Sequence, residues 1–283
     1  MDNAKYLKRR VRFYVMSDMH IGDGSDRDDY LKGSLGYYRL ATELNRIEQE
    51  ITMDSNSGYR SEVVFLGDIV NGEYGYYNCY AKSSGYRLVK DFLSEYKHLS
   101  TYVVGNHDAD ASFYSDVAGF SRTRVVQYYK SCGVLFIHGH QFDPLCNRKT
   151  PIGMLGDLAS KFAANMMSPD NEDDARGAGQ DAFEDKSTNA NITQANEAIP
   201  KDMKSGGVGM SSSDYSICKH AVIRANALGC ANVICGHTHQ HKTRCDCIIA
   251  GKRISYFNVG KFARDRVSQL IFNDPLDNSE DTK

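Results

Sequence analysis

Three kinds of feature are missing from the 283-residue sequence, and each absence excludes a class of protein. No run of about 18 apolar residues is present, so we expect no transmembrane helix. The formal net charge is only −2, which gives no overall basic field to attract nucleic acid. The N-terminus has neither the apolar stretch nor the cleavage site of a secretory leader, and we therefore expect a cytoplasmic protein.

The eight cysteines follow neither the spacing of a disulfide framework nor that of a zinc ribbon. Several lie in strand-like or helix-like segments, which indicates buried, reduced thiols. Cys245 and Cys247 are the one close pair. Residues two apart on a strand share a face, so we interpret them as two thiols on one face of a strand. A metal or redox site is the alternative.

Short apolar runs that end in glycine or polar residues recur along the chain, as buried strands do. Five of these runs lead directly into candidate functional residues, and they lie at 11–16, 63–66, 101–104, 134–137 and 232–235. Apolar spacing also predicts helices near 35–51, 86–99 and 214–228, and further strands at 247–250, 254–259 and 267–272. The run at 63–66 delivers Asp68 at the tip of a strand, where open α/β sheets place their ligands.

Residues 145–213 interrupt this pattern. Apolar residues at helical spacing between 152 and 166 predict one amphipathic helix, and the stretch after it has almost no apolar periodicity. Such a stretch inside a domain is usually a lid or a disordered segment. We therefore expect one domain over 1–273 with a lid insertion at about 145–213, followed by a polar, disordered tail at 274–283.

The residues at the five strand ends have side chains that bind metal ions. They are Asp18, His20, Asp68, Asn106, His138, His237 and His239. Two carboxylates, four imidazoles and one amide oxygen suit a pair of first-row ions such as Mn, Fe, Zn or Co, whereas an all-oxygen set would suit Mg or Ca better. Any one of these side chains has an ordinary structural explanation, but five such strand ends together favour a metal site.

The order of these motifs resembles that of the calcineurin-like metallophosphoesterases. The resemblance rests on Asp18-x-His20, Gly67-Asp68, Gly105-Asn106-His107-Asp108, His138-Gly139-His140 and Gly236-His237-Thr238-His239. It implies an α/β fold, a four-layer α-β-β-α sandwich with an inserted lid, and a dinuclear metal site at one edge. One ion would take Asp18, His20 and His239, the other Asn106, His138 and His237, with Asp68 bridging both.

The resemblance also implies a reaction. Two divalent ions, Mn²⁺ above all, would attract a phosphate group and supply metal-bound hydroxide for attack on phosphorus in a phosphodiester or diphosphate bond. His107 would protonate the leaving oxygen or hold the phosphate, and Asp108 would orient the His107 ring. His140 is expected to contact the substrate or to support the ligands from outside.

The substrate is less closely defined. The large insertion between the two histidine motifs resembles that of the UDP-2,3-diacylglucosamine pyrophosphatase-related branch, which implies a nucleotide-sugar or lipid-linked substrate and leaves peripheral membrane contact open. Asn71, Tyr76 and Tyr77 are candidate substrate contacts. That branch has arginine at the position of His107, which favours a broader phosphoesterase. A DNA nuclease of the same superfamily and a non-catalytic scaffold are the alternatives, and the filled ligand positions argue against the scaffold.

Overall fold

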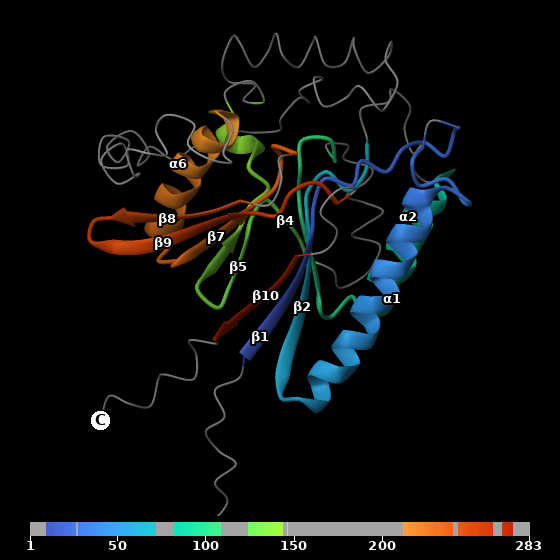
Figure 1. The fold of residues 1–283 in the computed structure, drawn as a ribbon, viewed down its shortest axis with the longest axis horizontal. Coiled ribbons are helices and arrows are strands. Elements are labelled where there is room, and N and C mark those ends of the chain that lie inside the picture. Colours follow the sequence, from blue (N-terminus) through green and yellow to red (C-terminus); the bar gives the residue numbers. More distant parts are fainter. Residues whose placement is uncertain are drawn as a thin grey trace, which may run out of the picture.

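Two five-stranded β-sheets lie face to face at the centre of the molecule (Figure 1). The computed structural model describes residues 10–26, 28–71, 82–108, 124–143, 146, 212–239, 243–262 and 268–273. No helix in these ranges is long and apolar enough to cross a membrane.

The first sheet is mostly parallel. Its strands are β1 (Arg10–Met16), β2 (Tyr59–Leu66), β3 (Ser100–Val103), β4 (Arg124–Val126) and β10 (Ser268–Asn273). The strand order is β10-β1-β2-β3-β4, in which β1 to β4 are parallel and β10 pairs antiparallel with β1. The C-terminal ends of β1, β2 and β3 therefore meet at one edge of this sheet.

The second sheet has antiparallel strands at both edges. It contains β5 (Tyr129–Ser131), β6 (Val134–Phe136), β7 (Asn232–Cys235), β8 (Thr243–Ile249) and β9 (Lys252–Asn258). The order is β5-β6-β7-β9-β8, with β6, β7 and β9 parallel. The ends of β6 and β7 therefore point the same way, and the short helix η3 (His140–Phe142) follows β6.

Alternation along β1 shows how the strands fill two cores at once. Phe13 and Val15 face the second sheet, where the Phe13 ring lies 4.9 Å from that of Phe136. Tyr14 and Met16 point the opposite way, toward the helices that cover the first sheet. These four side chains of β1 are all fully buried, so this part of the strand is apolar on both faces.

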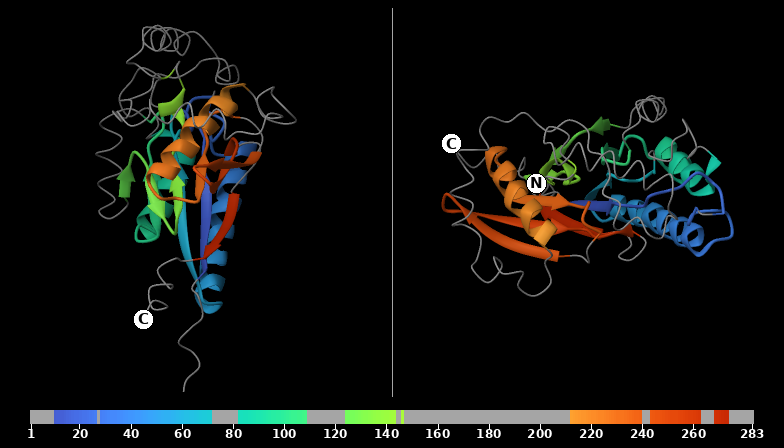
Figure 2. Two further views of the ribbon diagram at one scale, coloured as in Figure 1. Left: turned by 90° about the vertical axis from the view of Figure 1, so that its left-hand side faces the viewer. Right: turned by 90° about the horizontal axis from the view of Figure 1, so that it is seen from above.

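Helices cover the outer face of each sheet (Figure 2). α1 (Leu35–Asn56) and α2 (Ser84–Glu95) pack on the first sheet, and α6 (Ser212–Ala227) packs on the second. Ser34 caps α1 by accepting a hydrogen bond from the amide of Tyr37. The apolar side chains that α1 buries recur at helical spacing and are Leu40, Leu44 and Ile47. The predicted four-layer α-β-β-α sandwich is confirmed.

Most predicted elements are present, and the differences are local. β4 and β5, of three residues each, were not predicted, because so short a run shows no periodicity. α2 ends at Glu95 rather than near residue 99. The predicted lid lies outside the described residues except for Cys146 and the start of α6. The predicted tail, Tyr76 and Tyr77 also lie outside them.

Candidate metal centre

Loops that follow β1, β2, β6 and β7 bring two overlapping groups of ligand atoms together. In each group, one carboxylate oxygen or imidazole nitrogen per residue lies within 4.8 Å of all the others. The first group is Asp18, His20, Asp68 and His239, and the second is Asp68, His138 and His237. Asp68 belongs to both groups, so its carboxylate is placed to bridge two metal ions.

The backbone that carries these residues adopts an uncommon conformation. Non-glycine residues rarely have a positive φ, because Cβ then crowds the neighbouring carbonyl oxygen. Among the described residues, seven non-glycines do so, and five of them belong to the two ligand groups. These five are Asp18, His20, Asp68, His237 and His239, with φ between 52° and 73°. Such strain costs about 1–3 kcal/mol per residue and clusters at functional sites.

Hydrogen bonds between neighbouring loops hold this strained backbone. The amide of Asp18 donates to the carbonyl oxygen of Gly67 at 3.0 Å, and the amide of His20 donates to that of Asp68 at 2.9 Å. The loops after β1 and β2 thus continue the pairing of their strands beyond the sheet. The two carboxylates of the site are therefore fixed relative to one another before any ligand binds.

In the first group, two imidazoles point at the same position. His20 Nε2 lies 2.8 Å from His239 Nε2, and His239 Nε2 lies 3.2 Å from a carboxylate oxygen of Asp18. Burial and the neighbouring His107 and His239 lower the pKa of His20 well below its usual value, so the ring is neutral. A neutral imidazole has one nitrogen lone pair to offer, which is what a divalent cation requires.

In the second group, one hydrogen bond fixes which nitrogen of His138 can bind metal. Nδ1 of His138 lies 2.7 Å from the carbonyl oxygen of Leu66 and donates to it, so Nε2 is the ligand atom. Nε2 lies 3.1 Å from Asp68. The side chain of Asn106, in the loop after β3, is buried, and neither its Oδ1 nor its Nδ2 has a hydrogen-bond partner. A cation on Oδ1 would satisfy an amide that is otherwise costly to bury. The residues present therefore fit a pair of divalent ions.

Comparison with known proteins agrees with this geometry. The family model described as calcineurin-like phosphoesterase matches residues 11–241. The chain belongs to the calcineurin-like phosphoesterase family. Members are mostly metal-dependent hydrolases of phosphate esters that bind divalent ions in a dinuclear site. No curated protein matches the chain.

The role predicted for one residue of this calcineurin-like phosphoesterase is wrong. Asp108 was expected to orient the His107 ring, but its carboxylate accepts hydrogen bonds from the Tyr102 hydroxyl and from four backbone amides. These amides belong to Asp68, Ile69, Val70 and Gly105. Asp108 therefore links the loop after β2 to the loop after β3. The same hydrogen bonds satisfy its carboxylate, because a buried carboxylate needs several donors.

Asn71 is the residue that lies against the His107 ring. Its Oδ1 is 3.0 Å from His107 Nδ1. The backbone amide of His107 donates to Asp68 Oδ1 at 2.8 Å, so the residue is held at both its main chain and its ring. The ring packs edge-on against that of His20, with centroids 4.7 Å apart. His107 is thus fixed beside the first ligand group without belonging to it.

Three further residues border the second ligand group. His140, which was a predicted substrate contact, is buried, and neither of its ring nitrogens has a hydrogen-bond partner. Its ring centroid lies 5.5 Å from that of His138. Asp143 Oδ2 and Cys146 Sγ lie 3.2 Å and 3.7 Å from His237 Nε2. Asp143 and Cys146 were not identified from the sequence, because they lie at the start of the expected lid, Cys146 inside it, and neither directly follows an apolar strand.

Proposed function

We propose that this phosphoesterase hydrolyses a phosphodiester or diphosphate bond with two divalent ions, Mn²⁺ being the first choice. The observation that carries the proposal is that Asp68 belongs to both groups of ligand atoms. When bound, such an ion pair supplies positive charge for the phosphate oxygens and lowers the pKa of a coordinated water, so that hydroxide is available at neutral pH.

The proposed ligand sets follow the two groups. Asp18, His20 and His239 hold one ion, Asn106, His138 and His237 hold the other, and Asp68 bridges them. The close approach of His20 to His239 and the buried, unpartnered amide of Asn106 support this division. Mixed nitrogen and oxygen ligands favour Mn, Fe, Zn or Co over Mg and Ca.

We assign to His107 the transfer of a proton to the leaving oxygen. The contact between Nδ1 and Asn71 Oδ1 fixes the ring, so that Nε2 is the nitrogen available to the substrate. His107 also approaches the site through its amide, which donates to Asp68. A proton donor held in this way stays in place while the bond to phosphorus breaks.

A cavity that is linked to the loops of the site through Phe262 supports a substrate larger than a simple phosphate ester. It has a volume of about 240 Å³ and is lined by residues that include Tyr30, Arg39 and Phe262. Phe262 donates its amide to the carbonyl oxygen of Ser17, which directly precedes Asp18. Aromatic rings and a guanidinium suit a nucleoside or sugar phosphate. We therefore propose a nucleotide diphospho-sugar, free or lipid-linked, as the substrate class to test first.

The test is a substrate panel on protein that has been stripped of metal and reloaded with Mn²⁺. The panel contains a bis-aryl phosphodiester, an aryl monophosphate, nucleotide diphospho-sugars and single-stranded DNA. Asp68→Asn should lose both ions and slow turnover by roughly 10³-fold or more, because it removes one charge shared by both. Asp246→Asn is the matched control, since Asp246 pairs with Arg253 at the surface.

Each outcome has a defined meaning. Cleavage of the phosphodiester or diphosphate by the wild type but not by Asp68→Asn supports the proposal. Cleavage of DNA alone, in a salt-sensitive manner, would replace it with a nuclease. Metal-loaded protein that cleaves nothing at any pH would replace it with a metal-binding scaffold.

A further inference from the structure

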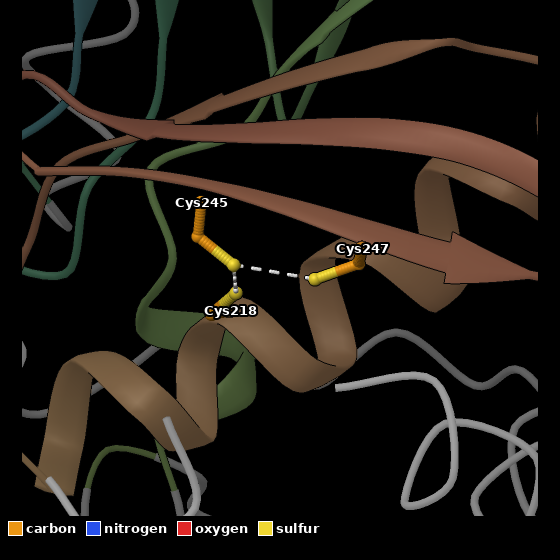
Figure 3. A group of neighbouring side chains, drawn as sticks. All are labelled: Cys218, Cys245 and Cys247. Atoms are coloured by element: carbon orange, nitrogen blue, oxygen red, sulfur yellow. Dashed lines mark hydrogen bonds between the residues drawn. The ribbon is translucent and has the colours of Figure 1, made fainter. Parts of the chain in front are cut away.

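Three cysteines from two different elements meet in the core of the second sheet (Figure 3). Cys218 lies on α6, and Cys245 and Cys247 lie on β8. Sγ of Cys245 is 3.7 Å from that of Cys218 and 3.3 Å from that of Cys247. All three sulfur atoms lie within 4.8 Å of one another, and all three residues are buried. The sequence placed Cys245 and Cys247 on one face of a strand, but the spacing could not show that a third thiol faces them.

The surroundings of this group are apolar. The three cysteines belong to the buried core between α6 and the second sheet, which also contains Ile217, Val222 and Tyr256. Asp246, between the two strand cysteines, points away and pairs with Arg253 and Ser255. Within the part of the chain that the structure describes, the group consists of thiols alone. A donor set of this kind selects soft ions, because thiolate binds Zn²⁺ or Cu⁺ far better than Mg²⁺ or Ca²⁺.

Two of the three sulfur–sulfur distances are close to those of a metal–thiolate site. Zn–S bonds of about 2.3 Å at tetrahedral angles place sulfur atoms about 3.8 Å apart. The observed distances of 3.3 Å and 3.7 Å require shifts of only a few tenths of an ångström. We propose that Cys218, Cys245 and Cys247 supply three thiolate ligands to a Zn²⁺ site that is separate from the dinuclear centre.

A metal at this position would hold α6 against β8, close to the dinuclear centre. Ile217, the neighbour of Cys218, packs near Gly139, where an added Cβ would lie 3.3 Å from the Ile217 side chain. Gly139 stands between His138 and His140. We expect the zinc to act as a structural ion that keeps α6 in place behind this segment.

The site can be tested with Co²⁺, which reports sulfur ligands directly. Metal-free protein, kept under a phosphine reductant, is titrated with Co²⁺, and the near-ultraviolet sulfur-to-cobalt charge-transfer band is recorded. We expect the band to grow to the intensity of one sulfur-bound Co²⁺ per chain, after any Co²⁺ taken up by the dinuclear centre, and Zn²⁺ to abolish it. The same band should be lost in Cys247→Ser and in the double variant Cys245→Ala/Cys247→Ala, which keeps the core apolar. Failure of folded wild-type protein to give the band, or survival of the band in folded double variant, would overturn the proposal.

Two control variants separate this site from other thiols. Cys230→Ser removes a buried thiol outside the group, and Cys146→Ser removes the thiol next to His237. Both should keep the band. Loss of the band in Cys146→Ser alone would assign the signal to the dinuclear centre and contradict the proposal. Because the readout is a sulfur band, it does not depend on whether phosphoester hydrolysis is found.

Discussion

Gly105 lies so close to Asp68 that no side chain can be accommodated there: a Cβ on Gly105 would be 2.1 Å from Asp68 Oδ1. The same crowding recurs at Gly236, where a Cβ would be 2.5 Å from Asp18 Oδ2. In both cases the glycine directly precedes a proposed ligand. The glycines in these motifs are therefore required because the carboxylates of neighbouring loops occupy the space of a side chain.

This relationship predicts that Gly105→Ala displaces the bridging carboxylate. We expect the variant to lose Mn²⁺ and to slow turnover by about 10²-fold or more, since a shift near 1 Å has that effect at a catalytic site. Gly133→Ala is the control, because Gly133 has a φ of +69° but open space around it. It should lose about 1–2 kcal/mol of stability and keep its metal. Metal analysis and thermal unfolding of both variants distinguish steric displacement from general destabilisation. Full metal content in Gly105→Ala would refute the argument.

His107→Ala should retain both ions but slow turnover by roughly 10²–10⁴-fold, as the loss of a general acid does. The effect should be larger for an alkyl leaving group than for a nitrophenolate, which departs without a proton. Asn71→Leu, which removes the partner of Nδ1, should also slow turnover, but by a smaller factor than His107→Ala. His98→Ala, at an exposed position, should change neither rate nor metal content. A leaving-group dependence equal to that of the wild type would remove His107 from the role of acid.

The site residues could be predicted from the sequence where they lie close together in one motif. Asp18 and His20 share one loop, and Gly67 and Asp68 share another, so the motif itself indicates a strand end and its ligand. The parallel order of β1, β2 and β3 then brings such ends to one edge, as the general rule for α/β sheets requires. The four-layer fold followed from the same ordered motifs.

The sequence was insufficient where a contact depends on how distant segments pack. Asp143 meets His237 across 94 positions, and Asp108 reaches back 40 positions to the amide of Asp68. Neither pairing has a local pattern, since both arise only when the loops of two strands lie side by side. Cys218 faces Cys245 for the same reason, through the packing of α6 on β8. Substrate contacts proposed at Tyr76 and Tyr77 remain predictions.

Metal binding should release protons, and the structure indicates one source. Burial would lower the pKa of His138, but the carboxylates of Asp68 and Asp18 outweigh burial and raise it to about 10 in the metal-free protein. The ring is therefore protonated at neutral pH, and Nε2 must lose its proton before it can bind an ion. Calorimetric titration with Mn²⁺ in two buffers of different ionisation enthalpy should give different heats. Equal heats in the two buffers would mean that no proton leaves.

The same shift predicts opposite pH trends for the two forms of the protein. A histidine whose pKa is raised on folding stabilises the metal-free fold. This contribution is fully present below pH 6.5, the pKa in the unfolded chain, and is lost as the pH rises through about 10, the pKa in the folded protein. Chelator-treated protein should therefore lose stability on going from neutral to alkaline pH. Metal-loaded protein should gain stability over the same pH range, because the affinity for the ion increases as the proton is removed. Thermal unfolding across this pH range, with and without chelator, measures both trends; parallel curves would contradict them.

Asp143→Asn should weaken only one of the two ions. Asp143 Oδ2 lies 3.2 Å from His237 Nε2, and carboxylates that orient a ligating histidine typically contribute 10–100-fold in affinity. The asparagine side chain has nearly the same shape as aspartate and can still accept a hydrogen bond, so the substitution removes the negative charge with little change in packing. Burial lowers the pKa of His237, whereas the bond with Asp143 raises it, so the variant should also make this ring a weaker base.

A two-step Mn²⁺ titration is the appropriate measurement, because the ion proposed for Asp18, His20 and His239 does not use His237 and should bind as before. We expect the second step alone to weaken by about 10–100-fold. Asp246→Asn should leave both steps unchanged, because the Asp246 carboxylate on β8 accepts a hydrogen bond from Arg253 on β9. Complete loss of the second ion would make Asp143 a ligand in its own right, and unchanged affinity would mean that its contact with His237 has no part in metal binding. The size of the loss, not its mere presence, therefore decides what Asp143 contributes.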